Sequence, residues 1–458
     1  MDELRKHVAT SALHDTSTRQ NDHTTECHPQ TRQLLLQQLV ESPVFVDRLI
    51  HWFWGPVGAG KTSVMRSLAR RLEAKGDFAA GFYFWRSDGA RNSLKNFFPT
   101  LAVQLADNDT STASHIEQAI KGNKGLLEKS FKTQMEKLII TPLVAGHRDS
   151  PSTSHPRVFV IDGLDECDSD GQREFLEELL PALISRLSDL RITVFVSSRP
   201  EPGIENRFSH PRLSNLTNRI CLEASEEDVH LFLVDEFEEI NRCHPGLKDE
   251  NGGKWPGMGD LETLEDKSSG YFILVKTAMR YIKPDKLRGR APDQRLRDVL
   301  EAFRADPLRP LDALYLSILR QNCPEGPADF EEWKTVIGLI CIPLECGMAQ
   351  WTSAFGSYEY ALFIRYGKGL SALQQMISEL GSLFYIEEHT GQLRNYHASF
   401  ADCVFNPERG AEFAMDPGRL HERIACALVE SMSTTSTFLA LGTHTKASGY
   451  GSLKHPHF

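Results

Sequence analysis

The 458-residue chain lacks the features of a secreted, zinc-binding or membrane-inserted protein. Its nine cysteines form no Cys-x-x-Cys pair and have no histidine at zinc-ligand spacing, so neither a zinc site nor a disulfide framework is indicated. The first twenty residues contain no long apolar run, which argues against a secretory signal. No stretch is long and apolar enough to span a bilayer, and an odd cysteine count fits a reducing compartment. We therefore expect a cytoplasmic protein with no membrane span.

Positive charge is also in short supply. The 51 Lys and Arg residues against 62 Asp and Glu residues give a formal net charge of −11, so we expect no nucleic-acid partner, although one local basic patch remains compatible with this balance. A content of 40% hydrophobic and 25% charged residues is typical of a globular protein. Because the chain is too long for one hydrophobic core, its length predicts two to four domains. The sequence shows no internal repeat.

Residues 55–62, with the sequence GPVGAGKT, fit a phosphate-binding pattern in which two glycines separated by four residues precede Lys and a hydroxyl residue. The preceding residues 49–54 form an apolar run typical of a buried strand, and apolar residues at helical spacing follow through residue 72. The order of strand, glycine loop and helix directs a helix N-terminus at the phosphates. The bare pattern also arises by chance, but the strand and helix around it favour a phosphate loop.

Each residue type in this loop has a chemical role. Glycine lets successive backbone N–H groups point at phosphate oxygens, where a Cβ would clash. We expect Lys61 to reach the β- and γ-phosphates and the Thr62 hydroxyl to hold Mg²⁺. The nucleotide-binding residues that we expect in this loop are Gly55, Gly58, Gly60, Lys61, Thr62 and Ser63.

A second chemical signal follows the apolar run at residues 157–162. An acid at the C-terminal end of a buried parallel strand lies at the edge where open α/β sheets bind ligands. We expect Asp162 to hold Mg²⁺, and Asp165 or Glu166 to orient or deprotonate an attacking water molecule as the catalytic carboxylate. The alternative is that these acids only cap the following helix, and for Asp168 and Asp170 we prefer that interpretation.

Arg199 follows another apolar run, at residues 191–198, and is expected at the same edge. A guanidinium there can read the γ-phosphate with two hydrogen bonds and so distinguish a triphosphate from a diphosphate. The alternative is a surface arginine in a polar loop. Alternating strands and helices with short loops predict a mostly parallel sheet covered by helices on both faces. Periodicity does not give the order of the strands.

Beyond residue 208 the pattern changes to helices, which we expect at residues 226–240, 271–282, 294–303 and 311–321. A third unit begins near residue 330 with helical runs, including one at residues 370–380, and a hairpin at residues 383–396. Ser399 and Asp402 have capping-box spacing at the start of the next helix. Helices followed by a wing-like hairpin describe a winged-helix unit. We favour a packing role for it over DNA binding, because it has no basic recognition helix.

These changes divide the chain into five parts. The polar lead-in, residues 1–26, and the tail, residues 431–458, are expected to be disordered. Between them we expect a P-loop nucleotide-binding domain at residues 27–210, a helical domain at residues 211–325 and a winged-helix-like domain at residues 326–430. The expected fold class is therefore α/β, a P-loop NTPase parallel sheet followed by a helical lid and a winged-helix domain.

Six motifs resemble those of fungal NACHT proteins, which carry nephrocystin-like N-terminal domains and belong to the NLR-like STAND class of P-loop NTPases. In chain order they are CHPQTR at residues 27–32, the phosphate loop, FYFWRSD at residues 82–88, DGLDEC at residues 162–167, SSRP at residues 197–200 and YHASF at residues 396–400. The resemblance spans about residues 27–405. Gln30 stands where the fungal pattern usually has Gly.

The resemblance implies a signal-transduction switch. ADP holds a closed monomer, and exchange for ATP opens the protein and permits assembly into a homo-oligomer. It implies that Arg199 senses the γ-phosphate and that His397 contacts the β-phosphate of ADP and locks the closed state, although a lone His before a helix is otherwise more often structural. The family's usual effector and sensor domains are not recognisable in this chain, so we expect such proteins to act in trans or to be missing.

The sequence leaves three functional hypotheses open. The first is an ATP- and ADP-binding switch with slow, Mg²⁺-dependent ATP hydrolysis. The second is a truncated nucleotide-binding scaffold, or an inhibitor of full-length relatives, without significant turnover. The third is an ATPase or GTPase with steady turnover, but the chain has no Asn-Lys-x-Asp segment to read guanine.

Overall fold

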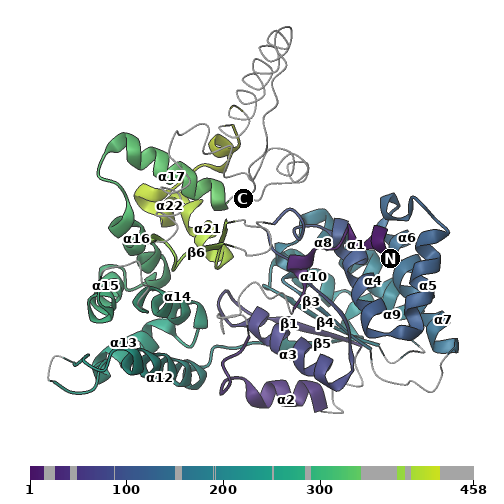
Figure 1. Ribbon diagram of the computed structural model, residues 1–458, viewed down its shortest axis with the longest axis horizontal. Coiled ribbons are helices and arrows are strands. Elements are labelled where there is room, and N and C mark those ends of the chain that lie inside the picture. Colours follow the sequence, from purple (N-terminus) through teal and green to yellow (C-terminus); the bar gives the residue numbers. More distant parts are fainter. Residues whose placement is uncertain are drawn as a thin grey trace, which may run out of the picture.

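The computed structural model describes residues 1–14, 26–41, 49–86, 88–149, 157–188, 190, 192–249, 252–283, 290–341, 379–386, 393–422 and 426. These residues form two bodies, a sheet with its covering helices and a helical body beside it (Figure 1). Each body has its own hydrophobic core. The expected tail at residues 431–458 and nearly all of the helix expected at residues 370–380 lie outside the described residues.

Five parallel strands form the sheet in the order β2-β3-β4-β1-β5. They are β1 Ile50–Trp54, β2 Phe78–Tyr83, β3 Arg157–Asp162, β4 Ile192–Ser198 and β5 Thr217–Cys221. At one end of the sheet, Trp54 lies beside Ser198, and Tyr83 lies beside Asp162. The predicted parallel sheet is confirmed, and the parallel direction brings the ends of β1, β3 and β4 to a single edge.

The strand β5 was not expected. It extends the sheet past residue 210, where we expected the first domain to end. Its sequence TNRIC has only one residue that is well buried, Thr217, because it lies at the edge of the sheet. It therefore lacks the continuous apolar run that marks the inner strands.

Helices cover both faces of the sheet, as predicted. On one face, α2 and α3 pack against Phe53, Val160 and Phe195. The helices of this body are α1 Asp2–Arg5, α2 Gln33–Glu41, α3 Lys61–Lys75, α4 Phe97–Asn108, α5 Thr110–Lys121, α6 Phe131–Met135, α7 Thr141–Asp149, α8 Ser169–Glu174, α9 Leu180–Arg186, α10 Pro202–Ser209 and α11 Pro211–Ser214. Two π-helical turns, Glu136–Ile140 and Phe175–Leu179, connect α6 to α7 and α8 to α9. Among the helices that the structure describes, none has the length and hydrophobicity of a membrane span.

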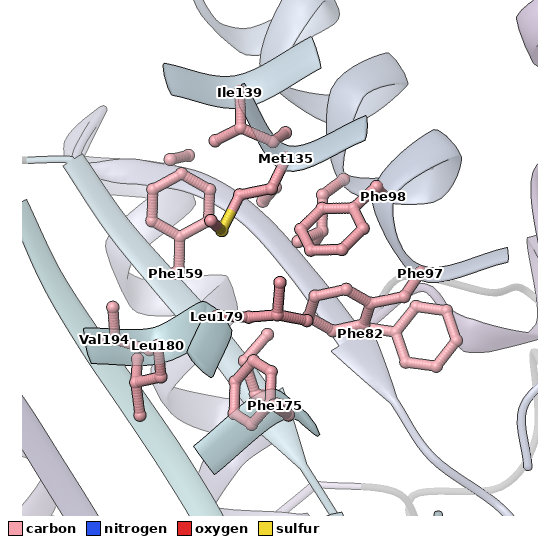
Figure 2. Close-up of a cluster of buried hydrophobic side chains, with 14 of the residues drawn as sticks. Phe82, Phe97, Phe98, Met135, Ile139, Phe159, Phe175, Leu179, Leu180 and Val194 are labelled. Carbon is pink, nitrogen blue, oxygen red and sulfur yellow. The ribbon is translucent and has the colours of Figure 1, made fainter. Parts of the chain in front are cut away.

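Aromatic side chains fill the opposite face of the sheet. Phe82 of β2 and Phe159 of β3 lie in one cluster with Phe97 and Phe98 of α4 (Figure 2). Phe82 and Phe97 meet edge to face with ring centroids 5.2 Å apart. Edge-to-face aromatic pairs stabilise a packing arrangement beyond the burial of apolar area alone. This cluster therefore fixes α4 on β2 and β3.

The second body contains helices and one hairpin. Its elements are α12 Glu226–Cys243, α13 Met258–Ser268, α14 Phe272–Ile282, α15 Pro292–Ala305, α16 Pro310–Asn322, α17 Pro327–Cys341, β6 Phe384–Ile386, β7 Leu393–Asn395, α21 Ala398–Val404 and α22 Pro407–Gly410. The predicted hairpin is confirmed, since β6 and β7 pair antiparallel. One hydrophobic core runs from α12 to α21, so the helical and winged-helix units that we expected to be separate share a core.

The start of the chain is ordered, contrary to our expectation. Leu4, Ala9 and Ala12 are buried in the core of the first body. Arg5 forms an ion pair with Asp107 of α4 at 2.8 Å. The segment is too short to show apolar periodicity, so its polar composition gave the wrong prediction for residues 1–14, while residues 15–25 lie outside the described part.

Replacing Leu4 with Asp is expected to release residues 1–14 from the first body, because the substitution buries an unpaired charge. Amide hydrogen exchange of this segment would then rise by at least about tenfold, which corresponds to a loss of about 1.4 kcal/mol. Lys6→Ala, at a side chain that is 69% exposed, serves as the control and is expected to leave the exchange unchanged. Equal exchange in Leu4→Asp and the unaltered protein would contradict the observed packing.

Candidate functional site

The phosphate loop lies between β1 and α3, as predicted. Gly58 and Gly60 have φ values of 81° and 85°, which side chains with a Cβ rarely adopt. Gly60 precedes the first residue of α3 and provides no side-chain cap. The first N–H groups of α3 are therefore available to an anion at the end of a fifteen-residue helix.

The second body closes over this loop. A Cβ at Gly58 would lie 2.1 Å from Cγ2 of Ile273, at the start of α14. The adjoining Phe272 donates its backbone N–H to the carbonyl oxygen of Gly58 at 3.0 Å. Gly58 therefore serves two purposes, because it bends the loop and lets α14 approach it.

Lys61 is the first residue of α3, and its side chain folds back over the loop. Its Nζ donates to the carbonyl oxygens of Gly55 at 2.8 Å and Pro56 at 2.9 Å. Burial lowers the pKa of Lys61, while the nearby Asp165 and Asp162 oppose that change. The ammonium group is thus held at the mouth of the loop, next to the carboxylates of β3 and the turn that follows it.

Asp162, the last residue of β3, meets the residue with which it was predicted to share Mg²⁺. Its carboxylate accepts hydrogen bonds from the hydroxyls of Ser197 and Thr62. Burial raises the pKa of Asp162, and these two hydroxyls lower it. A buried carboxylate beside a threonine hydroxyl at the helix N-terminus is a suitable oxygen donor set for Mg²⁺.

Asp165 and Arg199 form a close pair at the neighbouring strand ends. Asp165 accepts the backbone N–H of Arg199 at 2.9 Å and lies 3.1 Å from Nε of the same residue. Only 3% of the Asp165 side chain is exposed. Since both carboxylate oxygens are engaged by Arg199, Asp165 positions that arginine, which leaves Glu166 better placed for acid–base chemistry.

Glu166 is a half-buried carboxylate whose pKa is raised toward neutrality. It ends the 3₁₀ turn Leu164–Glu166 and accepts the backbone N–H of Arg86 at 3.1 Å. Burial, together with the negative charge of Asp165, raises the pKa of Glu166 to about 7. A carboxylate with a pKa near neutrality is suited to accept a proton from water.

His397 belongs to the second body but reaches the same cavity. Its Nδ1 accepts the backbone N–H of Ser399 at 3.1 Å and lies 2.8 Å from the Ser399 hydroxyl, which in turn lies 2.8 Å from the Tyr315 hydroxyl. Burial lowers the pKa of His397 to about 3, and the charge of Arg199 acts in the same direction. The ring is therefore neutral with its proton on Nε2, and it can donate one hydrogen bond.

The helix α21 begins differently from the sequence prediction. Ser399 and Asp402 do not form a capping box; His397 caps α21 by accepting from the Ser399 N–H. Asp402 instead lies 3.1 Å from Nη1 of Arg199, across the boundary between the two bodies. Capping-box spacing alone could not distinguish these outcomes, because Asp402 has a stronger partner in a distant segment. Asp168 does cap α8, as predicted, by accepting the N–H of Gly171.

The residues that line a single cavity of about 200 Å³ include Gly58, Gly60, Lys61, Thr62, Ser63, Asp162, Asp165, Glu166, Arg199 and His397. Both bodies contribute to it, and α21 and β6 lie on the side of the second body that faces the sheet (Figure 1). Six cationic and three acidic side chains line the cavity, namely Lys61, Arg66, Arg91, Arg199, Lys276 and Arg280, and Asp162, Asp165 and Glu166. In a chain with a net charge of −11, this local excess of positive charge suits a phosphate-rich anion.

Residues 35–199 match the protein-family model Nephrocystin 3, N-terminal. The matched segment begins in α2, contains the phosphate loop and ends at Arg199. The resemblance to nephrocystin-like domains is therefore confirmed for this part of the chain. Sheet, loop and carboxylates together make the first body a nucleotide-binding domain of the P-loop NTPase type. The fungal origin stays a prediction.

Several solved structures are similar to this chain at low identity. A Walker-type ATPase of Pyrococcus abyssi is 11% identical, with 83% of this chain and 98% of that chain covered and a TM-score of 0.35. Cdc6p from Pyrobaculum aerophilum is 14% identical, with 87% and 100% covered and a TM-score of 0.35. The Aeropyrum pernix ORC1 protein, solved in complex with DNA, is 15% identical, with 81% and 90% covered and a TM-score of 0.34. No curated protein matches the chain.

Sequence reasoning missed the contribution of α14 to the site. Lys276 and Arg280 line the cavity, and Nζ of Lys276 lies 3.4 Å from the Ser63 hydroxyl. The guanidinium of Arg280 stacks over the ring of Tyr396, 4.0 Å from its centroid. Two cations four residues apart on the otherwise apolar helix FILVKTAMRYI share one helix face, and this pattern was the available signal.

The motif at residues 27–32 has a joining role in the structure. Cys27 donates its backbone N–H to the hydroxyl of Ser67 in α3 at 2.9 Å, and Arg32 pairs with Asp228 of α12 at 3.2 Å. The motif thus connects the phosphate-loop helix to the second body. Gln30, which stands where the fungal pattern usually has Gly, is exposed.

The neutral His397 makes the stability of the protein depend on pH. Its pKa is about 3 in the folded state and ordinarily 6.5, so its contribution is complete above pH 6.5 and is lost as the pH falls toward 3. Between pH 7 and pH 5 the free energy of unfolding is expected to fall by about 2 kcal/mol more in the unaltered protein than in His397→Gln. Urea titrations of both proteins at the two pH values measure this difference. Parallel losses would show that His397 is not held neutral.

Proposed function

We propose that the protein is an ATP- and ADP-binding NACHT-type switch, in which slow Mg²⁺-dependent hydrolysis of ATP controls opening and self-assembly. The observation that carries this proposal is the shared cavity. Lys61 and Arg199 come from the nucleotide-binding body, and His397 comes from the second body. A nucleotide whose phosphates contact all three residues would bind the two bodies at once, so its phosphate number can influence how they are arranged.

The cavity residues divide the work of holding phosphates. The N–H groups at the start of α3 and the ammonium of Lys61 bind phosphate oxygens, and the Nε2 proton of His397 is available as a further donor. Gly55, Gly58 and Gly60 keep the loop free of side chains that would block this approach. Ser63 lies beside Lys276, so the loop and α14 act on the same anion.

The residues at the edge of the sheet also fit a magnesium ion. Thr62 and Asp162 would hold it, since their oxygens already meet in a hydrogen bond. When bound, Mg²⁺ would neutralise phosphate charge during transfer to water. Among the described residues no group of three His, Cys, Asp or Glu side chains is placed to hold a metal ion, which fits a metal that relies on phosphate oxygens for further ligands.

Glu166 is the residue that we assign to proton transfer from water, and Asp165 holds Arg199 in place beside it. A pKa of about 7 leaves roughly half of the Glu166 carboxylates protonated at neutral pH. Slow turnover follows from the lack, in a monomer, of an arginine supplied by another subunit. A slow step suits a switch, because the triphosphate state then lasts long enough to act.

The structure corresponds to the closed state in this proposal. The cavity of about 200 Å³ lies where the two bodies meet, so their separation would give a nucleotide wider access to it during exchange. Separation would break the contact of α14 with Gly58 and expose surface for homo-oligomer formation. Effector or sensor proteins would act on this cytoplasmic switch in trans.

Lys61→Ala is expected to weaken the binding of both ATP and ADP by at least about a hundredfold, because the substitution removes the ammonium group at the loop. Isothermal titration calorimetry in the presence of Mg²⁺ measures both affinities. Lys121→Ala removes a remote lysine that is 71% exposed and is the matched control. Unchanged affinities in Lys61→Ala would sink the assignment of the phosphate loop.

Glu166→Gln is expected to bind ATP but to hydrolyse it more slowly, and its residual rate should not depend on pH. In the unaltered protein the rate is expected to rise about tenfold from pH 6 to pH 8, since a carboxyl group with a pKa near 7 becomes the active carboxylate over this range. Phosphate release under single-turnover conditions gives both profiles. Identical profiles would remove Glu166 from the mechanism. Binding without hydrolysis or assembly in the unaltered protein would favour the scaffold hypothesis.

A further inference from the structure

The second body places the carboxylate of Asp402 beside Arg199, the residue expected to sense the γ-phosphate. Oδ2 of Asp402, in α21, lies 3.1 Å from Nη1 of Arg199, which follows β4. Oδ1 of Asp402 lies 3.9 Å from Nη1 of Arg86, in the loop after β2. Arg86 in turn donates from Nη2 to the backbone carbonyl oxygen of Asp165 at 3.1 Å. A charge network therefore joins α21 to the ends of three strands.

Arg199 is shared by two carboxylates that belong to different bodies and differ in burial. Asp165 lies in the same body, is 3% exposed and is fixed to the backbone of Arg199. Asp402 lies in the other body, is 28% exposed and reaches Arg199 through its side chain alone. When the bodies separate, Asp402 is the carboxylate that leaves, while Asp165 stays.

We propose that Asp402 is a specificity-determining residue that occupies Arg199 in place of the γ-phosphate and thereby makes the closed state prefer ADP to ATP. This inference rests on the proposed function. An anion that approaches Arg199 must compete with Asp402 for the same guanidinium and is also repelled by its negative charge. A diphosphate has one phosphate fewer and avoids both penalties.

The proposal assigns distinct tasks to two residues of one short segment. His397 donates a hydrogen bond toward phosphate and so strengthens nucleotide binding to the closed state. Asp402, five residues later, weakens the binding of a nucleotide that carries a third phosphate. Binding of ATP would displace Asp402 from Arg199 and with it α21, which converts the presence of one phosphate into movement of the second body.

The test compares ADP with a non-hydrolysable ATP analogue in Asp402→Asn, which keeps the shape of the side chain and removes its charge. Calorimetry with the full chain and Mg²⁺ is expected to show a shift of about tenfold in relative affinity toward the triphosphate, equal to about 1.4 kcal/mol, with ADP binding little changed. Asp402→Ala is expected to shift the ratio in the same direction and serves as a second variant if Asp402→Asn folds poorly. Glu408→Gln, an exposed carboxylate on α22, is the matched control and is expected to leave the ratio unchanged.

A double-mutant cycle tests the route through Arg199. In an Arg199→Gln background, Asp402→Asn is expected to change the affinity ratio by less than about twofold, because the shared guanidinium is gone. A full tenfold effect in that background, or an unchanged ratio in Asp402→Asn itself, would overturn the proposal while leaving nucleotide binding intact. An unaltered protein that binds neither nucleotide would instead overturn the proposed function and this inference with it.

Discussion

Positive charge gathered in a small cavity between the two bodies is the constraint on which the rest of the structure depends. Six cationic and three acidic side chains line a space of about 200 Å³, although the chain as a whole carries a net charge of −11. Charges in such a place are costly unless they have partners. Carbonyl oxygens of the loop surround the ammonium of Lys61, and carboxylates flank Arg199. The positive excess that remains is what a polyphosphate would neutralise.

Polar contacts help to hold the two bodies together at the cavity. Phe272 donates a backbone hydrogen bond to Gly58, and Asp402 forms an ion pair with Arg199. Each body has its own hydrophobic core, which stays intact if the boundary opens. Domains arranged in this way move as rigid units when a ligand changes the contacts between them. The site is thus both the place where a nucleotide would bind and the joint that it would control.

The parts of the site that the sequence predicts are those carried by single local segments. The phosphate loop is continuous from Gly55 to Thr62, and Asp162 ends an apolar run that is typical of an inner strand. The parallel direction of the strands then brings Arg199 to the same edge. The role of His397 was predicted only through the family resemblance, because a single histidine before a helix does not indicate a ligand contact.

The remaining features depend on how distant segments pack. Strand order is set by contacts between elements, and β5 is an edge strand with little apolar pattern. The buried position of Leu4 depends on α4, about one hundred residues away, and composition alone indicated disorder. Asp402 had the spacing of a helix cap but pairs with Arg199, 203 residues distant. Sequence spacing cannot predict that an acid will pair with an arginine from a distant segment rather than cap its own helix.

The central claim is that the closed structure is held by a diphosphate nucleotide in the shared cavity. The most direct measurement is to denature the freshly purified protein and to identify any released nucleotide by chromatography. The account predicts close to one equivalent of ADP per chain. A protein that releases no nucleotide and also fails to bind added ATP would contradict the account.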